Sequence, residues 1–248
     1  MNRALNATSI GLFGFVAVLM LASLTIRESL IPNDTLSLWA GAIVAGDGKL
    51  SLGHIVAAYP TLPFLATAAL QWLTPEGTPA PALLAAALLG VLAGWWFVSF
   101  RGKGLPLVTA GLATALLAFH PVLLRAAVAG PSEMLVAGFL FLLGNALFDL
   151  RQRGAAPEVM TVALSLMGLA FSHPMGAAIA CAVVPYLVFA VPPALVARSA
   201  VNVVLTLVFP AVFSIGAFSY ISWVFPGNGW SFYSSPSQSL TAWLSGVD

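Results

Sequence analysis

Residues 9–26 read S-I-G-L-F-G-F-V-A-V-L-M-L-A-S-L-T-I, a run of 18 residues without a charged side chain. A helix rises about 1.5 Å per residue, so about 20 such residues cross the ~30 Å hydrocarbon core of a bilayer. One cation, Arg3, precedes the run, and no small-x-small cleavage site follows it. We therefore interpret residues 9–26 as an uncleaved first membrane helix.

The whole chain has the composition of a membrane protein. Of its 248 residues, 60% are apolar and 7% are charged, against roughly 45–50% and 25% in soluble domains. The net charge of +1 excludes a basic surface for nucleic acid and a highly charged disordered segment. The single cysteine, Cys181, excludes an intramolecular disulfide and a cysteine-based metal cluster. A single polytopic bundle is the simplest fold for this composition.

Six later apolar runs predict further membrane helices. They cover residues 82–100, 105–124, 134–150, 155–172, 175–195 and 200–224. With the first run, they give an all-α, polytopic transmembrane helix bundle of about seven spans, forming one domain over residues 1–248. The two long remaining pieces, residues 27–81 and 225–248, are expected on the far side of the membrane, with short interfacial or re-entrant helices.

A shorter apolar run, residues 62–73, decides the predicted topology. Its 12 residues are too few to span, so we expect a re-entrant or interfacial segment. Most of the cations then face the cytoplasm, as the positive-inside rule requires: Arg3, Arg101, Lys103, Arg151, Arg153 and Arg198. An eight-span topology with the opposite orientation also satisfies the rule, but it needs this run to span. We expect the plasma (inner) membrane of a bacterium, with the N-terminus cytoplasmic and the C-terminus periplasmic or extracellular.

Several polar residues are expected together at the far-side ends of the helices. Asp34-Thr35 predicts the cap of a short helix that runs through Ala45, with Trp39 at headgroup depth. His120 and Arg125 close the third span, and Glu133 begins the fourth. His173 joins the fifth span to the sixth. Ionisable groups at membrane depth indicate function, but each also has a structural alternative.

The structural alternatives are specific. Asp34 suits a helix cap, and Glu133 suits the first turn of a helix with Arg125 as its partner. His120 and His173 each precede a proline at the end of a span. Capping or interfacial roles suffice for these two histidines, while as a pair they also suit a metal ion.

Four stretches follow one another in a distinctive order. Asn33-Asp34-Thr35 lies in the loop after the first helix, Tyr59-Pro60-Thr61-Leu62 precedes the short run, and residues 95–101 end in Arg101. The most specific stretch is residues 120–133, H-P-V-L-L-R-A-A-V-A-G-P-S-E. This order resembles the GT-C class of integral membrane glycosyltransferases, which use polyprenyl-phosphate-linked sugars. Residues 225–233 are loosely similar to a later segment of that class.

The resemblance implies inverting transfer of a sugar from a lipid phosphate to an acceptor on the far side. Such a reaction needs a base and a positive charge for the leaving phosphate. By the resemblance, Asp34 is the base, Glu133 is a second acid that orients the acceptor or a divalent metal, and Arg125 contacts the phosphate. The remaining substrate-binding candidates are His120, His173 and Tyr59.

Other readings of the function stay open. The resemblance covers the shared seven-helix module of the class, so a partner membrane protein is expected to supply the variable module. A non-catalytic subunit of the same fold, which binds lipid or scaffolds a partner complex, is the main alternative. A small transporter is favoured only by Pro185 and Pro210, which predict breaks within spans, and the scarcity of charge inside the spans argues against an ion path.

Overall fold

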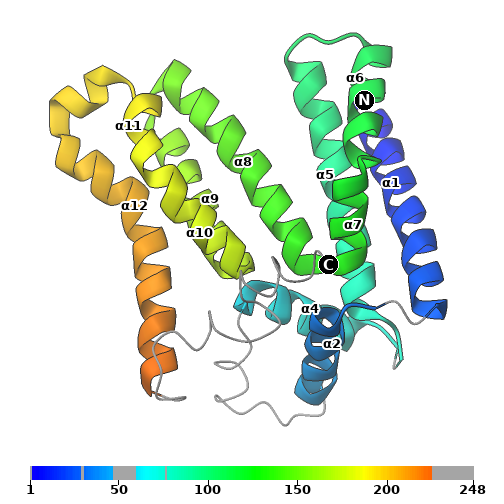
Figure 1. Ribbon diagram of the computed structural model, residues 1–248. Coiled ribbons are helices and arrows are strands. Elements are labelled where there is room, and N and C mark those ends of the chain that lie inside the picture. Colours follow the sequence, from blue (N-terminus) through cyan, green and yellow to red (C-terminus); the bar gives the residue numbers. More distant parts are fainter. Residues whose placement is uncertain (1, 29–30, 47–59, 76, 225–248) are drawn as a thin grey trace, which may run out of the picture. The chain divides into compact units, whose positions relative to one another are not determined.

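The computed structural model describes residues 2–28, 31–46, 60–75 and 77–224. Throughout these ranges the protein is all-helical, with no strand (Figure 1). The helices are α1 (Asn2–Arg27), α2 (Asn33–Gly46), α4 (Thr61–Leu73), α5 (Ala80–Gly102), α6 (Leu107–Ala118), α7 (Pro121–Ala129), α8 (Pro131–Arg153), α9 (Ala156–Ser172), α10 (Pro174–Val183), the 3-10 turn η1 (Val184–Tyr186), α11 (Leu187–Ala190) and α12 (Pro193–Val224).

The chain divides into two compact units. The first comprises residues 1–49 and 65–134, and the second comprises residues 50–64 and 135–248. In the first unit, α5 packs along α1 and also contacts α2, α6 and α7 (Figure 1). Helix α5 is therefore the centre of the first unit.

Small residues set the distance between α1 and α5. A methyl group on Gly90 would lie 2.8 Å from the carbonyl oxygen of Gly11, and one on Gly11 would lie 2.7 Å from the carbonyl oxygen of Gly90. Ala7 and Gly94 face each other one turn further along the same crossing. The spacing small-xxx-small at residues 7 and 11 and at residues 90 and 94 is the pattern that lets membrane helices touch through their backbones.

The predicted third span, residues 105–124, is not one straight helix. Helix α6 ends at Ala118, and α7 starts at Pro121 with its axis bent by 54°. His120 takes the extended conformation (φ −63°, ψ 131°), because the residue before a proline avoids the helical region and Pro121 has no amide hydrogen to continue the ladder. The ring of Phe119 packs edge-on against Phe13 of α1, with centroids 5.9 Å apart.

The second unit has a continuous apolar core. Leu150 of α8, Leu166 of α9 and Leu207 of α12 are all fully buried in it. The rings of Phe171 and Phe218 join α9 to α12 edge-on at 5.0 Å. Helix α9 also contacts α10 along its length, so α9 is the helix around which the second unit packs.

The two prolines expected to break spans behave differently. Pro185 lies in η1, which interrupts the predicted span 175–195 between α10 and α11. The expected break at Pro210 is wrong, because α12 continues through this residue and its one non-helical residue is Ser199. Helices in apolar surroundings tolerate proline because neighbouring groups and local adjustments can satisfy the freed carbonyl, which here is that of Thr206. One turn further on, the Ser214 hydroxyl donates to the Pro210 carbonyl at 2.6 Å.

Four of the described helices are long and apolar enough to cross a membrane: Ala7–Leu24, Ala80–Gly102, Pro131–Arg153 and Ser199–Ile221. The bent pair α6–α7 makes a fifth if it is one span. The predicted count of seven is not confirmed, since α9 has 17 residues and α10 is shorter. These helices, with large apolar side chains exposed along α6 and α12, are compatible with an integral membrane protein.

Candidate functional site

The first turn of α2 lies against the end of α7, and both belong to the first unit. Thr35, which is 8% exposed, donates its hydroxyl hydrogen to the carbonyl oxygen of Ala129. Helix α2 begins at Asn33, so Asp34 stands inside the first turn instead of at the cap. The side chain of Asp34 lies outside the described residues, as do Tyr59 and residues 225–248.

A glycine makes this contact possible. Gly130 ends α7 with φ 141° and ψ −179°, a conformation that is essentially restricted to glycine. A methyl group on Gly130 would lie 2.8 Å from the Thr35 hydroxyl oxygen. The glycine in the stretch 120–133 therefore has a physical function, which is to admit the Thr35 side chain beside the α7–α8 turn.

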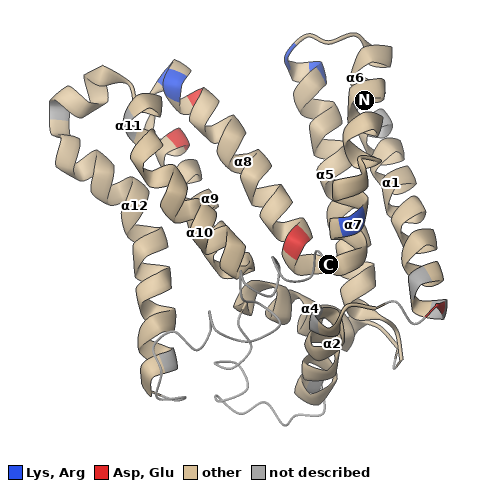
Figure 2. Cartoon of the chain, viewed as in Figure 1, with Lys and Arg blue, Asp and Glu red and all other residues tan. Residues whose placement is uncertain are grey.

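Glu133 and Arg125 flank this turn. Glu133 lies in the first turn of α8, as predicted. Arg125 is exposed on α7, four residues before Ala129, and residues four apart share one face of a helix. Figure 2 shows the cation on α7 and the acid at the start of α8. The turn therefore combines the start of α2, Glu133 and the face of α7 that carries Arg125.

A small apolar pocket lies beside Thr35. Its volume of about 20 Å³ has room for about one water molecule, so a sugar ring does not fit inside. Residues from four helices and two connecting segments line it: Ala22, Ile26, Ile31, Thr35, Trp39, Pro79, Pro81, Ala82 and Val128. None of these side chains is ionisable, so the chemistry of the site depends on the α7–α8 turn and not on the pocket.

Both candidate histidines are helix caps. The Nδ1 atom of His120 accepts a hydrogen bond from the amide of Val122 at 3.3 Å, at the start of α7. The Nδ1 atom of His173 accepts one from Met175 at 3.0 Å, at the start of α10. In each case the following proline occupies the first helical position, where its missing amide hydrogen costs nothing. The structural alternative for the two histidines is confirmed.

We expect the His173 cap to make stability depend on pH. His173 lies between α9 and α10, and burial lowers its pKa below the ordinary value of 6.5. The folded protein then keeps the imidazole neutral where the unfolded chain binds a proton. The contribution to stability is complete above pH 6.5 and is lost as the pH falls below it through the folded-state pKa.

Unfolding of detergent-solubilised protein above and below pH 6.5 measures this loss. The control is His173→Asn, because asparagine caps helices well and does not titrate in this range. The variant should show a flatter dependence in the same interval. An equally steep dependence in wild type and variant would contradict the assignment of the effect to His173.

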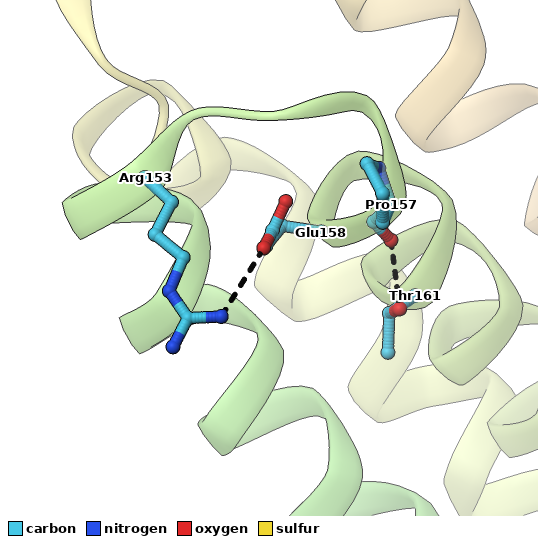
Figure 3. A network of polar contacts seen from close by, with 4 residues as sticks. All are labelled: Arg153, Pro157, Glu158 and Thr161. Atoms are coloured by element: carbon cyan, nitrogen blue, oxygen red, sulfur yellow. Dashed lines mark hydrogen bonds and ion pairs between the residues drawn. The ribbon is translucent and has the colours of Figure 1, made fainter.

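A second polar contact closes the α8–α9 turn (Figure 3). Arg153 lies 3.7 Å from the carboxylate of Glu158, and the Thr161 hydroxyl donates to the Pro157 carbonyl at 2.8 Å. The Arg153 side chain is 67% exposed, so this ion pair contributes at most about 1 kcal/mol. We interpret it as a structural contact of the second unit.

The described residues offer no ready donor set for a metal ion. Within them, no three His, Cys, Asp or Glu side chains gather around one point; the side chain of Asp34 lies outside this set. Sequence reasoning missed the residues that hold the site together, namely Thr35 and Gly130. The only sequence signal for them is the glycine before Pro131, which is typical of a helix end.

Comparison of the chain with protein-family models, with curated protein sequences and with solved structures finds no match.

Proposed function

We propose that the protein is a membrane glycosyltransferase that moves a sugar from a polyprenyl-phosphate donor to an acceptor on the far side of the membrane. One observation carries the proposal. The Thr35–Ala129 hydrogen bond joins two of the stretches on which the resemblance to GT-C enzymes rests, residues 33–35 and 120–133, across a separation of 94 residues. Unrelated short motifs have no reason to meet in the fold, whereas the parts of one active site must.

Each polar residue near this turn has a proposed role. Asp34 takes the proton from the acceptor hydroxyl, which makes the hydroxyl a better nucleophile. Glu133 orients the acceptor, and a divalent metal at these two oxygen donors is compatible with their chemistry. Arg125 stabilises the negative charge of the departing phosphate, for which the planar guanidinium is suited. We assign no acid–base or metal chemistry to the histidines, because Nδ1 of each caps a helix and the neutral ring then carries its hydrogen on Nε2, with no free lone pair.

The test is transfer by the protein reconstituted in liposomes. A panel of polyprenyl phosphates that carry different radiolabelled sugars is supplied together with water-soluble and lipid-linked acceptors. Time-dependent movement of label from donor to acceptor supports the proposal. No movement with any member of the panel, together with stoichiometric co-purification of another membrane protein, would overturn it and favour the non-catalytic subunit.

We propose that the site faces away from the cytoplasm. Arg101 lies in the last turn of α5 and donates to the Leu105 carbonyl at 2.6 Å, whereas the pocket and Thr35 adjoin the first turn of the same helix. Arg151 and Arg153 lie in the last turn of α8, and Glu133 lies in its first turn (Figure 2). Cations at one end of each helix suit a cytoplasmic face at that end.

This orientation predicts the side of the N-terminus. Because α1 runs from Asn2 to Arg27 and its Ala22–Ile26 end lines the pocket, a tag placed before Met1 should be cytoplasmic. In intact cells a membrane-impermeant reagent should fail to reach the tag, and it should react after the membrane is permeabilised. Labelling of the tag in intact cells would place the pocket on the cytoplasmic side and contradict the proposed orientation.

A further inference from the structure

Helices α2 and α4 are too short to span a membrane, yet they expose apolar side chains. Helix α2 has 14 residues, and α4 has 13. The largest exposure is at the end of α4, where Trp72 is 66% and Leu73 is 84% exposed. Side chains of this size and exposure at the end of a short helix need a covering surface.

The depth of α2 in the membrane follows from the pocket. Helix α1 ends at Arg27, α5 begins at Ala80, and both are long and apolar enough to cross a membrane. Ala22 and Ile26 of α1 line the same pocket as Thr35 and Trp39 of α2 and Pro81 of α5. The first turns of α2 are therefore level with the ends of two helices that can span, and such ends are expected near the boundary between headgroups and acyl chains.

Helix α4 is held at the same depth. The indole nitrogen of Trp39 donates to the side-chain oxygen of Gln71 at 3.2 Å. Trp39 therefore uses its N–H to bind α2 to α4. Only six residues, 74–79, connect α4 to the first residue of α5. Trp72 and Leu73 therefore directly follow Gln71, which bonds to α2, and lie only a few residues before the start of α5.

The two helices lack the charges that would attract an anionic surface. Helix α4 has no charged residue, and the only one in α2 is Asp34. Any membrane contact here depends on apolar burial and on the preference of tryptophan for the interface. It should therefore be indifferent to anionic lipid, unlike the contacts of basic helices.

We propose that Trp72 and Leu73 form an anchor that inserts into the headgroup–acyl boundary of the bilayer, and that its partner is phospholipid irrespective of headgroup charge. The anchor fixes the height of the α2–α4 pair, and with it the height of Thr35, above the hydrocarbon core. The proposal is independent of the glycosyltransferase activity, and its test uses no substrate.

The experiment places a fluorescent label at Leu73→Cys in a Cys181→Ser background, in phosphatidylcholine vesicles. Matched labels at Lys103→Cys, in the α5–α6 turn, and at Leu112→Cys, which is 61% exposed on α6, report water and acyl chains. The label at residue 73 should be quenched most by lipids with a shallow nitroxide, and the Leu112 label most by lipids with a deep one. Replacing a third of the lipid with phosphatidylglycerol should change nothing.

A second variant tests the role of Trp72. Trp72→Ala in the Leu73→Cys background should raise quenching by aqueous iodide by about two-fold, because the indole no longer holds the segment at the interface. Far-UV circular dichroism confirms that the helices remain. The anchor would be overturned if iodide quenched the label at residue 73 as strongly as it quenches the label at residue 103. Protection from both iodide and lipid nitroxides would overturn it too, since a protein surface would then cover the site.

Discussion

Asp34→Asn is expected to lower the rate of sugar transfer by about 10²–10⁴-fold, the usual contribution of a general base. Asparagine has nearly the shape of aspartate but cannot accept the proton of the acceptor hydroxyl. The loss should appear in the rate of the chemical step, measured under single-turnover conditions with the donor bound. Binding of the polyprenyl-phosphate sugar should change little, because the base acts on the acceptor.

Three further variants separate the proposed roles. Glu133→Gln should weaken binding of the acceptor. Thr35→Val should reduce the rate of transfer without removing a carboxylate, because it breaks only the hydrogen bond to Ala129. The control is Asp149→Asn, near the other end of α8 from Glu133, which should keep the parental rate. Equal rates for Asp34→Asn and Asp149→Asn would remove Asp34 from the mechanism.

Gly90→Ala is expected to destabilise the first unit by about 1–3 kcal/mol, as overpacking of a close contact does. The added methyl group would lie 2.8 Å from the backbone oxygen of Gly11, and a backbone atom cannot swing aside as a flexible side chain can. Helices α1 and α5 must therefore separate. Unfolding of the protein by SDS in mixed micelles, followed by circular dichroism, measures the change.

Two comparisons make this prediction specific. Gly111→Ala in α6 adds the same methyl group where no atom lies within 4 Å, so it should change stability by less than about 0.5 kcal/mol. In the double variant with Gly11→Ala, the second methyl group enters a gap that the first has already opened. The combined loss should then be smaller than the sum by about 1 kcal/mol. Equal effects of Gly90→Ala and Gly111→Ala would show that the crossing is not tight.

The helical character of the chain could be predicted from the sequence because it follows from local composition. Each apolar run that was expected to be a span contains helix, and residues 62–73 form the short helix α4. The ends and continuity of the helices were harder to predict. His120-Pro121 and Pro185 stop helices, whereas Pro210 does not, because the outcome depends on whether the surroundings can satisfy the backbone carbonyl four residues before the proline.

The candidate site could be predicted only in part for a related reason. The positions of Asp34 and Glu133 near helix starts follow from the sequence. The contact between Thr35 and Ala129 is tertiary and depends on the backbone of Gly130, which no local pattern specifies. The histidines suggested ligands because of their residue type. In both, Nδ1 accepts a backbone amide hydrogen as a helix cap, so the neutral ring carries its own hydrogen on Nε2 and has no lone pair left for a metal ion.

The pairing of α1 with α5 has a consequence for the synthesis of the protein. The end of α5, at Gly102, leaves the ribosome 75 residues after the end of α1, at Arg27. At about 5–20 residues per second, roughly 4–15 s pass before α5, the helix that packs against Ala7 and Gly11 of α1, is available. During that interval Ala7 and Gly11 lack the helix that packs against them, so the first seconds of biogenesis are when α1 is most open to mispairing.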